Sequence, residues 1–277
     1  MIKSFDELIE KVKKLPAKKV VIPGADTKTV IYAATLAKTE GIADFLLIGN
    51  KKKILSYIET IEKSLLDAFE IIDESDPVNC VQKAVESIHK KKADLILKGN
   101  TSTSQLMKGV LDKETGLQTG NLLSDVFIFE TEDRLTLMTD GGVVLYPEIK
   151  EKIALINNAV KVAHHLENPN PKVALLGAIE VPNPKMPPTI DAAIIAQMNK
   201  RGQIKGCIVD GPFALDNAIS EEAAKIKGVV SPVAGNADIL IMPNIEAGNI
   251  FGKALTYYAH LRVAHVVMGA KAPILIT

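Results

Sequence analysis

Tryptophan is absent from this 277-residue sequence, aromatic residues make up only 4% of it, and there are just two cysteines. Cys80 and Cys207 are far apart and lie in no Cys-x-x-Cys or Cys/His spacing. This excludes a disulfide framework and the usual zinc sites, so we expect no bound metal. Two buried thiols in a reducing cytoplasm are the expected state.

Net charge is also missing, because 33 basic residues balance 33 acidic ones. The sequence therefore carries no overall electrostatic signature of a nucleic-acid or membrane-surface partner. The segment Met1–Glu7 lacks the apolar core of a signal peptide, and no apolar run approaches the roughly 18 residues of a membrane span. We expect a soluble, cytoplasmic protein.

Two nucleotide-binding motifs are absent as well. There is no GxxxxGK[ST] sequence and no GxGxxG after an expected strand, which argues against nucleoside triphosphate hydrolysis and weakens a Rossmann dehydrogenase. The five histidines lie in no HExxH motif, and all are in or beside expected helices or strands. Packing or solvent exposure is their expected role.

What the sequence does contain is an alternation of short apolar runs with longer amphipathic ones. Several runs are continuously apolar, as strands buried on both faces of a mostly parallel sheet are. The expected strands are 19–22, 45–48, 94–97, 126–129, 135–138, 173–176, 207–209, 239–242 and 266–268. We expect helices to start at Asp76-Pro77, at Pro147-Glu148 and at Ser220, the last ending at Gly228. This alternation predicts an α/β fold.

Ligands of open α/β sheets collect beyond the carboxyl ends of the strands, and small and polar residues gather at those points here. The segments are 23–26, 98–104, 139–142, 210–212 and 243–249. In the second, Lys98, Gly99 and Asn100 precede four hydroxyl-bearing residues that lead into a helix containing Lys108. Such groups suit an oxyanion like phosphate. The alternative is that Ser102 or Ser104 only caps the helix and Lys98 is solvated.

Four carboxylates stand at or near these strand ends: Asp140, Asp210, Asp216 and Glu246. Each could serve as a base or a metal ligand, although carboxylates in loops are more often solvated or act as helix caps. Residue types and spacing alone therefore predict an anion-binding α/β enzyme.

Several long, ordered motifs resemble the phosphate butyryltransferase family, which is closely related to phosphate acetyltransferase. They span 183–187, 189–193, 201–207, 209–216, 220–224, 231–235, 237–239, 243–249 and 269–273. The resemblance covers the chain from about residue 94 onward, and the first 90 residues match more loosely in pattern.

The resemblance implies a two-domain fold like that of the isocitrate and isopropylmalate dehydrogenases, with a cleft between the domains. Residues 1–120 with 266–277 would form one domain, and residues 121–265 a second that also pairs subunits. The implied reaction is acyl-CoA plus phosphate giving acyl phosphate plus CoA, in a ternary complex without a covalent intermediate or a tightly bound cofactor. A butyryl or branched acyl group is expected over acetyl.

On this reading Asp140, Asp210 and Asp216 are the candidate catalytic carboxylates. The candidate substrate-binding residues are Lys98, Asn100, Thr101, Ser102, Lys108, Asn183, Lys185, Glu246 and Asn249. The chain departs from the family in three places. It has Met107-Lys108 where Leu-Arg is common, and Ser124-Asp125 where Ser-His is common, which removes an imidazole there. It also ends at Thr277, where the family continues with Ser-Arg-Ala-Asp, so we expect further C-terminal residues.

Two other functions remain open. An NAD-linked, metal-dependent decarboxylating dehydrogenase would use Asp140, Asp210 and Asp216 as metal ligands, and a non-catalytic CoA-binding member of the family would use none of them. For assembly, the segment Ala192–Met198 and the strand ends from Ile239 onward carry more apolar surface than a small domain needs. A homodimer, or an oligomer built from dimers, is expected.

Overall fold

The structure is a computed structural model that describes residues 1–276; Thr277, the end of the expected last domain segment, lies outside the described residues. The chain divides into two compact units. We call Ile9–Asn121 with Val266–Thr277 the N-terminal unit, and Met1–Leu8 with Leu122–His265 the central unit.

The first eight residues correct the expected division, which placed them with the rest of the N-terminal segment. The Ile2 N–H donates to the carbonyl of Leu166 at 2.9 Å, and Arg262 pairs with Asp6 at 2.9 Å. Ile2 is also almost completely buried. These contacts hold the start of the chain in the central unit.

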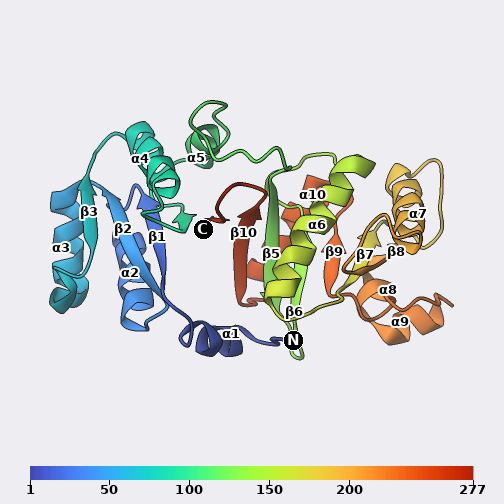
Figure 1. Ribbon diagram of the computed structural model, residues 1–277. Coiled ribbons are helices and arrows are strands. Elements are labelled where there is room, and N and C mark those ends of the chain that lie inside the picture. Colours follow the sequence, from blue (N-terminus) through green and yellow to red (C-terminus); the bar gives the residue numbers. More distant parts are fainter. Residues whose placement is uncertain (277) are drawn as a thin grey trace. The chain divides into compact units, whose positions relative to one another are not determined.

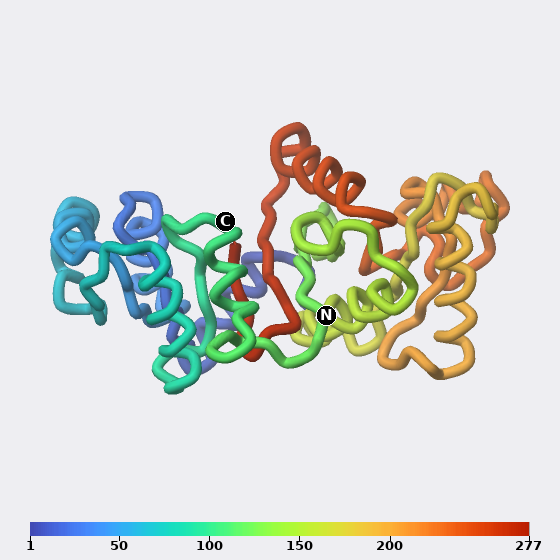
Figure 2. The backbone as a smooth tube through the Cα atoms, turned by 90° about the horizontal axis from the view of Figure 1, so that it is seen from above, coloured from blue at the N-terminus to red at the C-terminus, as the bar shows by residue number. Residues whose placement is uncertain are grey.

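The N-terminal unit is built on a parallel sheet in the order β3-β2-β1-β4-β11 (Figure 1). Its strands are β1 (Lys18–Pro23), β2 (Ala43–Gly49), β3 (Glu70–Asp73), β4 (Leu95–Leu97) and β11 (Ile274–Leu275). Its helices are α2 (Lys28–Thr39), α3 (Lys51–Glu62), α4 (Pro77–His89) and α5 (Thr103–Val110), with a 3-10 turn at Lys63–Leu65, and α1 (Phe5–Val12) precedes them. Helices α2 and α3 cover one face of this sheet and α4 the other (Figure 2).

The expected start of α4 is confirmed at the level of single contacts. Asp76 is the N-cap, its carboxylate accepts the Asn79 N–H at 2.9 Å, and Pro77 occupies the first helical turn, where no N–H partner is needed. On the other side of the sheet, Ile31 and Ile54 are fully buried against strand residues such as Ile22. Burial on both faces explains why the strands are continuously apolar.

The central unit has the strand order β10-β5-β6-β9-β7-β8. Its strands are β5 (Ser124–Glu130), β6 (Leu135–Thr139), β7 (Lys172–Leu176), β8 (Ile208–Phe213), β9 (Ile239–Ile241) and β10 (Val263–Met268), which continues into the N-terminal unit from Val266. Its helices are α6 (Ile149–His165), α7 (Pro187–Lys200), α8 (Leu215–Ile219), α9 (Glu221–Ile226) and α10 (Ile245–Tyr257). Strands β6, β9, β7 and β8 are parallel, and β5 is antiparallel to β6. Helices α6 and α10 cover opposite faces (Figures 1 and 2).

The expected α/β class with mostly parallel strands is therefore confirmed. Two strands were missed, β3 and β11, because each is short and β3 is only partly apolar. The strand expected at 207–209 was too short: β8 runs on to Phe213. Asp210 consequently lies inside a strand and not in a loop after it.

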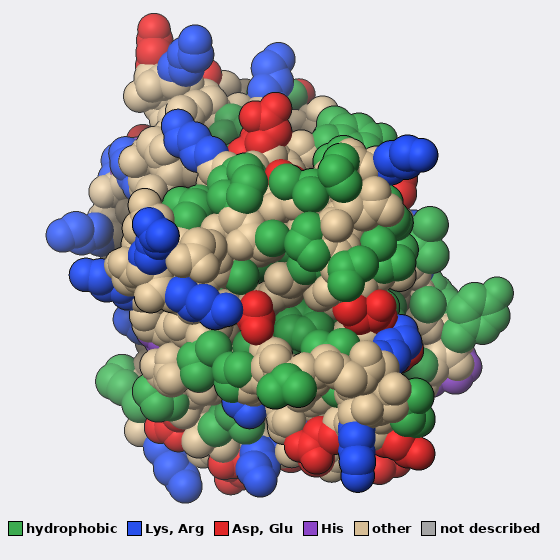
Figure 3. Space-filling view, turned by 90° about the vertical axis from the view of Figure 1, so that its right-hand side faces the viewer, with side chains coloured by type: hydrophobic (Ala, Val, Ile, Leu, Met, Phe, Trp, Pro, Cys, Tyr) green, Lys and Arg blue, Asp and Glu red, His purple; other side chains and the backbone are tan. Residues whose placement is uncertain are grey.

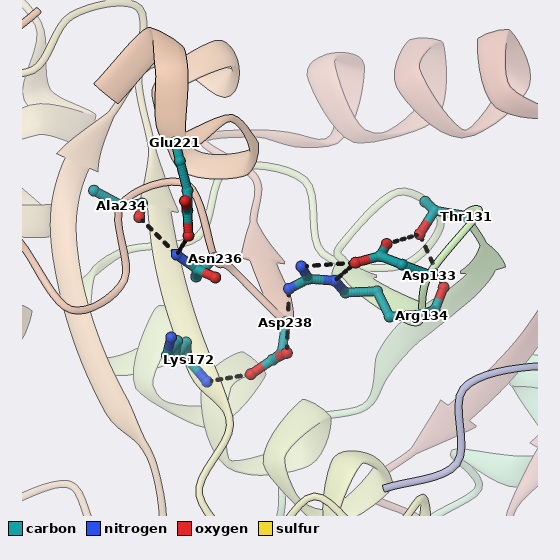
Figure 4. A network of polar contacts seen from close by, with 8 residues as sticks. All are labelled: Thr131, Asp133, Arg134, Lys172, Glu221, Ala234, Asn236 and Asp238. Atoms are coloured by element: carbon teal, nitrogen blue, oxygen red, sulfur yellow. Dashed lines mark hydrogen bonds and ion pairs between the residues drawn. The ribbon is translucent and has the colours of Figure 1, made fainter. Parts of the chain in front are cut away.

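A polar network ties together the amino ends of three strands in the central unit (Figure 4). The Asp238 carboxylate, just before β9, accepts the Lys172 N–H at the start of β7 at 2.8 Å. Its other oxygen lies 3.9 Å from the Arg134 guanidinium, which precedes β6. Because these strands are parallel, their carboxyl ends all lie at the opposite edge of the sheet.

Candidate functional site

At that opposite edge, Asp140 directly follows β6 and is 1% exposed. One carboxylate oxygen accepts the N–H groups of Gly142 and Val143, both at 2.7 Å, and the other accepts the Asp125 N–H at 2.8 Å. Burial raises the pKa of Asp140, while the three backbone donors act in the opposite direction. One oxygen thus holds the loop after β6, and the other ties Asp140 to the start of β5.

The start of α10 packs against this loop. Asn244 caps the helix by accepting the Ala247 N–H at 2.9 Å, and the Asn249 amide donates to the carbonyl of Gly141 at 2.9 Å. A Cβ on Gly248 would overlap the Asp140 carbonyl oxygen. The structure therefore brings two of the expected site residues, Asp140 and Asn249, to one place.

Glu246 lies in the first turn of α10 and is exposed. The hydroxyl of Tyr146 donates a hydrogen bond to its carboxylate, which lowers the pKa of Glu246 and raises the pKa of Tyr146. Leu145 on the same loop accepts the Ile245 N–H at 2.8 Å, so side chain and backbone together fix the 141–146 loop on α10.

The other two candidate catalytic carboxylates have partners of their own. Asp216, exposed on α8, pairs with Lys227 at 3.0 Å, which lowers the pKa of Asp216, and Lys227 also contacts Glu180. Asp210 accepts a hydrogen bond from the Ser231 hydroxyl at 2.6 Å. Within residues 1–276, no three His, Cys, Asp or Glu side chains form a group that could hold a metal ion.

The loop between β7 and α7 carries Asn183 and Lys185. The Asn183 carboxamide oxygen accepts the Lys185 N–H at 2.9 Å, and the Asn183 N–H donates to the buried Thr189 hydroxyl at 2.8 Å. The Lys185 side chain is exposed. These two hydrogen bonds hold the backbone of the loop, and the Lys185 ammonium group lies at the surface.

In the N-terminal unit, the expected anion-binding segment links β4 to α5. Ser102 forms a capping box with Gln105, so the capping role considered for this serine is confirmed. The Thr101 hydroxyl, in contrast, is buried and has no hydrogen-bond partner among the described residues. Lys108 is exposed on α5, and Lys98 is partly buried with its ammonium 3.5 Å from the Gly99 carbonyl.

Close backbone packing shapes this segment. The Asn100 N–H donates to the carbonyl of Gly24 at 2.7 Å. A Cβ on Gly99 would lie 2.5 Å from the carbonyl oxygens of Pro23 and Gly24. Glycine is therefore required where the ends of β1 and β4 meet.

Sequence reasoning missed one pair in the central unit. The Asp125 carboxylate, at the start of β5, lies 3.0 Å from Nδ1 of His265 on β10. The expectation that an imidazole is missing beside Asp125 was wrong, because a different segment supplies one. No local pattern could have shown this, since the two residues are 140 positions apart.

Comparison with known proteins places this geometry in context. The family model described as phosphate acetyl/butaryl transferase matches residues 77–277. The chain belongs to this family of phosphate acyltransferases. It is 49% identical to the phosphate butyryltransferase of Clostridium acetobutylicum, covering 100% of this chain and 92% of that protein. It is 43% identical to the phosphate acetyltransferase of Thermotoga maritima, covering 99% and 93%.

Solved structures agree with this assignment. A branched-chain phosphotransacylase from Enterococcus faecalis is 30% identical, with a TM-score of 0.82, covering 94% of this chain and 91% of that one. A 4-hydroxythreonine-4-phosphate dehydrogenase from Klebsiella pneumoniae, at 14% identity and a TM-score of 0.56, covers 95% and 90% and shares the fold alone. The expected dehydrogenase-like fold is thereby confirmed. Within the described residues, no helix is both long and apolar enough to cross a lipid bilayer.

Proposed function

We propose that this family member transfers a butyryl or branched short acyl group between CoA and inorganic phosphate, by direct transfer in a ternary complex in the cytoplasm. The observation that carries the proposal is the start of α5. There the buried Thr101 hydroxyl has no partner among the described residues, and the first helical turn and the preceding Lys98 offer further donors to a small anion, while Lys108 lies in the last turn of the same helix. The names of the relatives point to phosphate and a butyryl or branched acyl group, and CoA is the carrier that we propose for the acyl group.

The reaction needs no nucleophile from the protein. Phosphate itself attacks the thioester carbonyl, so holding two reactants in line and stabilising the developing charge supplies the rate enhancement. In this proposal Lys98, Asn100 and Lys108 hold phosphate, while Asn183, Lys185 and Asn249 bind the CoA part. Asp140, Asp210 and Asp216 stay candidate catalytic carboxylates, with Glu246 as a further polar contact.

The direct test measures CoA release from butyryl-CoA with and without phosphate, using full-length protein. Release that requires phosphate, and that is faster with butyryl-CoA or isobutyryl-CoA than with acetyl-CoA, is the expected result. Faster turnover of acetyl-CoA would contradict the acyl preference. Tight CoA binding without turnover of any short acyl-CoA would favour the non-catalytic alternative. Hydride transfer to NAD with a divalent metal would favour the dehydrogenase, although the three aspartates form no metal-ligand group here.

Replacing Lys108 with alanine is expected to raise the KM for phosphate about tenfold or more while leaving the protein folded. The side chain is exposed, and losing one surface lysine changes stability by about 0.5 kcal/mol or less. Lys52→Ala, at an exposed position on α3, is the matched control. Steady-state kinetics at varied phosphate concentration measure the KM of each variant, and an unchanged KM would remove Lys108 from the site.

The expected dimer surface needs a correction. Ala192, Ile195 and the β9 residues Ile239–Ile241 are buried within the central unit itself and offer no surface. The exposed large hydrophobic residues near α7, α8 and α9 are Val181, Ile194, Ile219, Ile226 and Val230. Figure 3 shows hydrophobic side chains gathered on this side of the unit.

We propose that a second copy of the chain covers this surface. Ile226 is 78% exposed and Val230 98%, which is unusual for residues of this kind. Sedimentation velocity at micromolar concentration should show a dimer or an assembly of dimers, and Ile226→Glu should shift it toward monomer. Leu15→Glu, at an exposed leucine of the N-terminal unit, should leave the assembly intact. A monomeric wild type would contradict the proposal.

A further inference from the structure

The pair formed by Asp125 and His265 has the features of an oriented acid–base group. The Asp125 side chain is 9% exposed, and an ionised carboxylate can only accept hydrogen bonds. In the neutral form of the imidazole, the 3.0 Å contact requires the proton on Nδ1, which donates to Asp125. The remaining ring nitrogen, Nε2, is then left as an acceptor, and it has no hydrogen-bond partner among residues 1–276.

The ring is held from a second direction. Phe127 meets the imidazole edge to face, with ring centroids 4.3 Å apart and planes at 85°. The His265 side chain is nonetheless one-third exposed, so the ring is not enclosed in the core. A histidine that served packing alone would not need a buried carboxylate on one nitrogen and a second nitrogen without a partner among the described residues.

The pair also abuts the loop after β6. The Asp125 N–H donates to Asp140, and the position of a Cβ on Gly142 would lie 3.0 Å from the Asp125 carboxylate. The second Asp125 oxygen is buried and has no partner among the described residues. The backbone of Asp125 is thus held by the same loop that contacts Asn249, and among the described residues the imidazole is the only side-chain partner of the Asp125 carboxylate.

We propose that His265 is the proton-transferring residue of the acyl-transfer reaction and that Asp125 is its positioning residue. This rests on the function proposed above. In the direction of acyl-CoA formation, Nε2 accepts the proton of the CoA thiol as sulfur bonds to the carbonyl carbon of the acyl phosphate. The C–O bond to phosphate then breaks, and the departing phosphate takes the proton from Nε2, which restores the neutral imidazole. The opposite direction runs through the same steps reversed.

Kinetics of His265→Gln test the proton-transfer role. Glutamine keeps a polar side chain but cannot shuttle a proton, so kcat should fall about 100-fold or more, the usual range for general acid–base catalysis. KM for acyl-CoA and phosphate should stay within about threefold, and added imidazole should restore part of kcat in His265→Ala. His165→Gln, at an exposed histidine on α6, is the matched control and should match wild type. Asp125→Asn should lower kcat about tenfold or more with KM unchanged. A His265→Gln variant with wild-type kcat would overturn the proposal.

A second measurement does not depend on turnover. In protein labelled with 15N-histidine, with His265→Gln to assign the signals, Nε2 of His265 should shift on addition of CoA but not of desulfo-CoA, which lacks the thiol. If both or neither compound shifts it, the thiol contact is absent and the proposal fails. Failure of the proposed function would appear differently, as wild-type protein that never releases CoA in response to phosphate.

Discussion

Replacing Asp191 with alanine is expected to lower the free energy of unfolding by about 3 kcal/mol. Asp191 on α7 pairs at 2.6 Å with Lys152 on α6, whose side chain is only 4% exposed. Without the carboxylate, a buried ammonium would have no counter-charge, and the unfolded state, where water solvates it, would be favoured. The estimate is taken at the low end of the range for buried pairs because Asp191 is 23% exposed. Urea denaturation of the variant and the wild type measures the difference.

Two further variants separate charge burial from packing. The double change Lys152→Met with Asp191→Leu replaces the pair by apolar side chains of similar volume, and it should restore stability to within about 1 kcal/mol of wild type. Lys150→Ala, at an exposed lysine on the same helix, should change stability by about 0.5 kcal/mol or less. If the Asp191→Ala variant were as stable as wild type, the Lys152–Asp191 pair would be solvated in solution and not buried.

Replacing Gly248 with alanine is expected to destabilise the protein by about 3 kcal/mol and to lower kcat/KM together with stability. The added Cβ would overlap the carbonyl oxygen of Asp140 and lie 2.9 Å from the Asp140 carbonyl carbon and from the Gly141 Cα. These are backbone atoms, so no side-chain rotation relieves the overlap. The helix or the loop after β6 must move, and the loop is held by the hydrogen bonds to Asp140.

Gly252, four residues further along α10, is the matched control. Its Cβ would make ordinary contacts of 3.4 Å with Met138 and Phe127 side chains. Alanine there should be neutral or stabilise the helix by up to about 1 kcal/mol, because alanine has the higher helix propensity. Denaturation midpoints of the two variants should therefore move apart. Equal midpoints would show that α10 and the loop adjust to each other freely.

Fold class and many elements followed from local sequence. Continuous apolar runs predicted most strands of both units, and Asp76-Pro77 predicted the start of α4 down to its capping contact. These features depend on the conformational preferences of a few adjacent residues and on burial of one segment, which a sequence pattern records directly. The family was recognisable for the same reason, because its motifs are contiguous.

The environment of the candidate site depended on tertiary structure. Local sequence marked Asp140 as a carboxylate after a strand, but only the fold shows both its oxygens accepting backbone N–H groups. The fold also shows that Asp216 pairs with Lys227. It shows as well that Ile239–Ile241 are buried within the central unit and do not lie on its surface. The partner and the burial of a side chain are set by segments that fold against it.

The clearest case is His265. The sequence by itself determined that His265 directly precedes one expected apolar strand and that Asp125 directly precedes another. Only the tertiary structure decided that the two meet at 3.0 Å, because pairing between segments 140 residues apart depends on the whole strand order. The sequence determines which side chains are present, whereas the fold determines which of them come into contact and so which nitrogen of an imidazole faces a carboxylate.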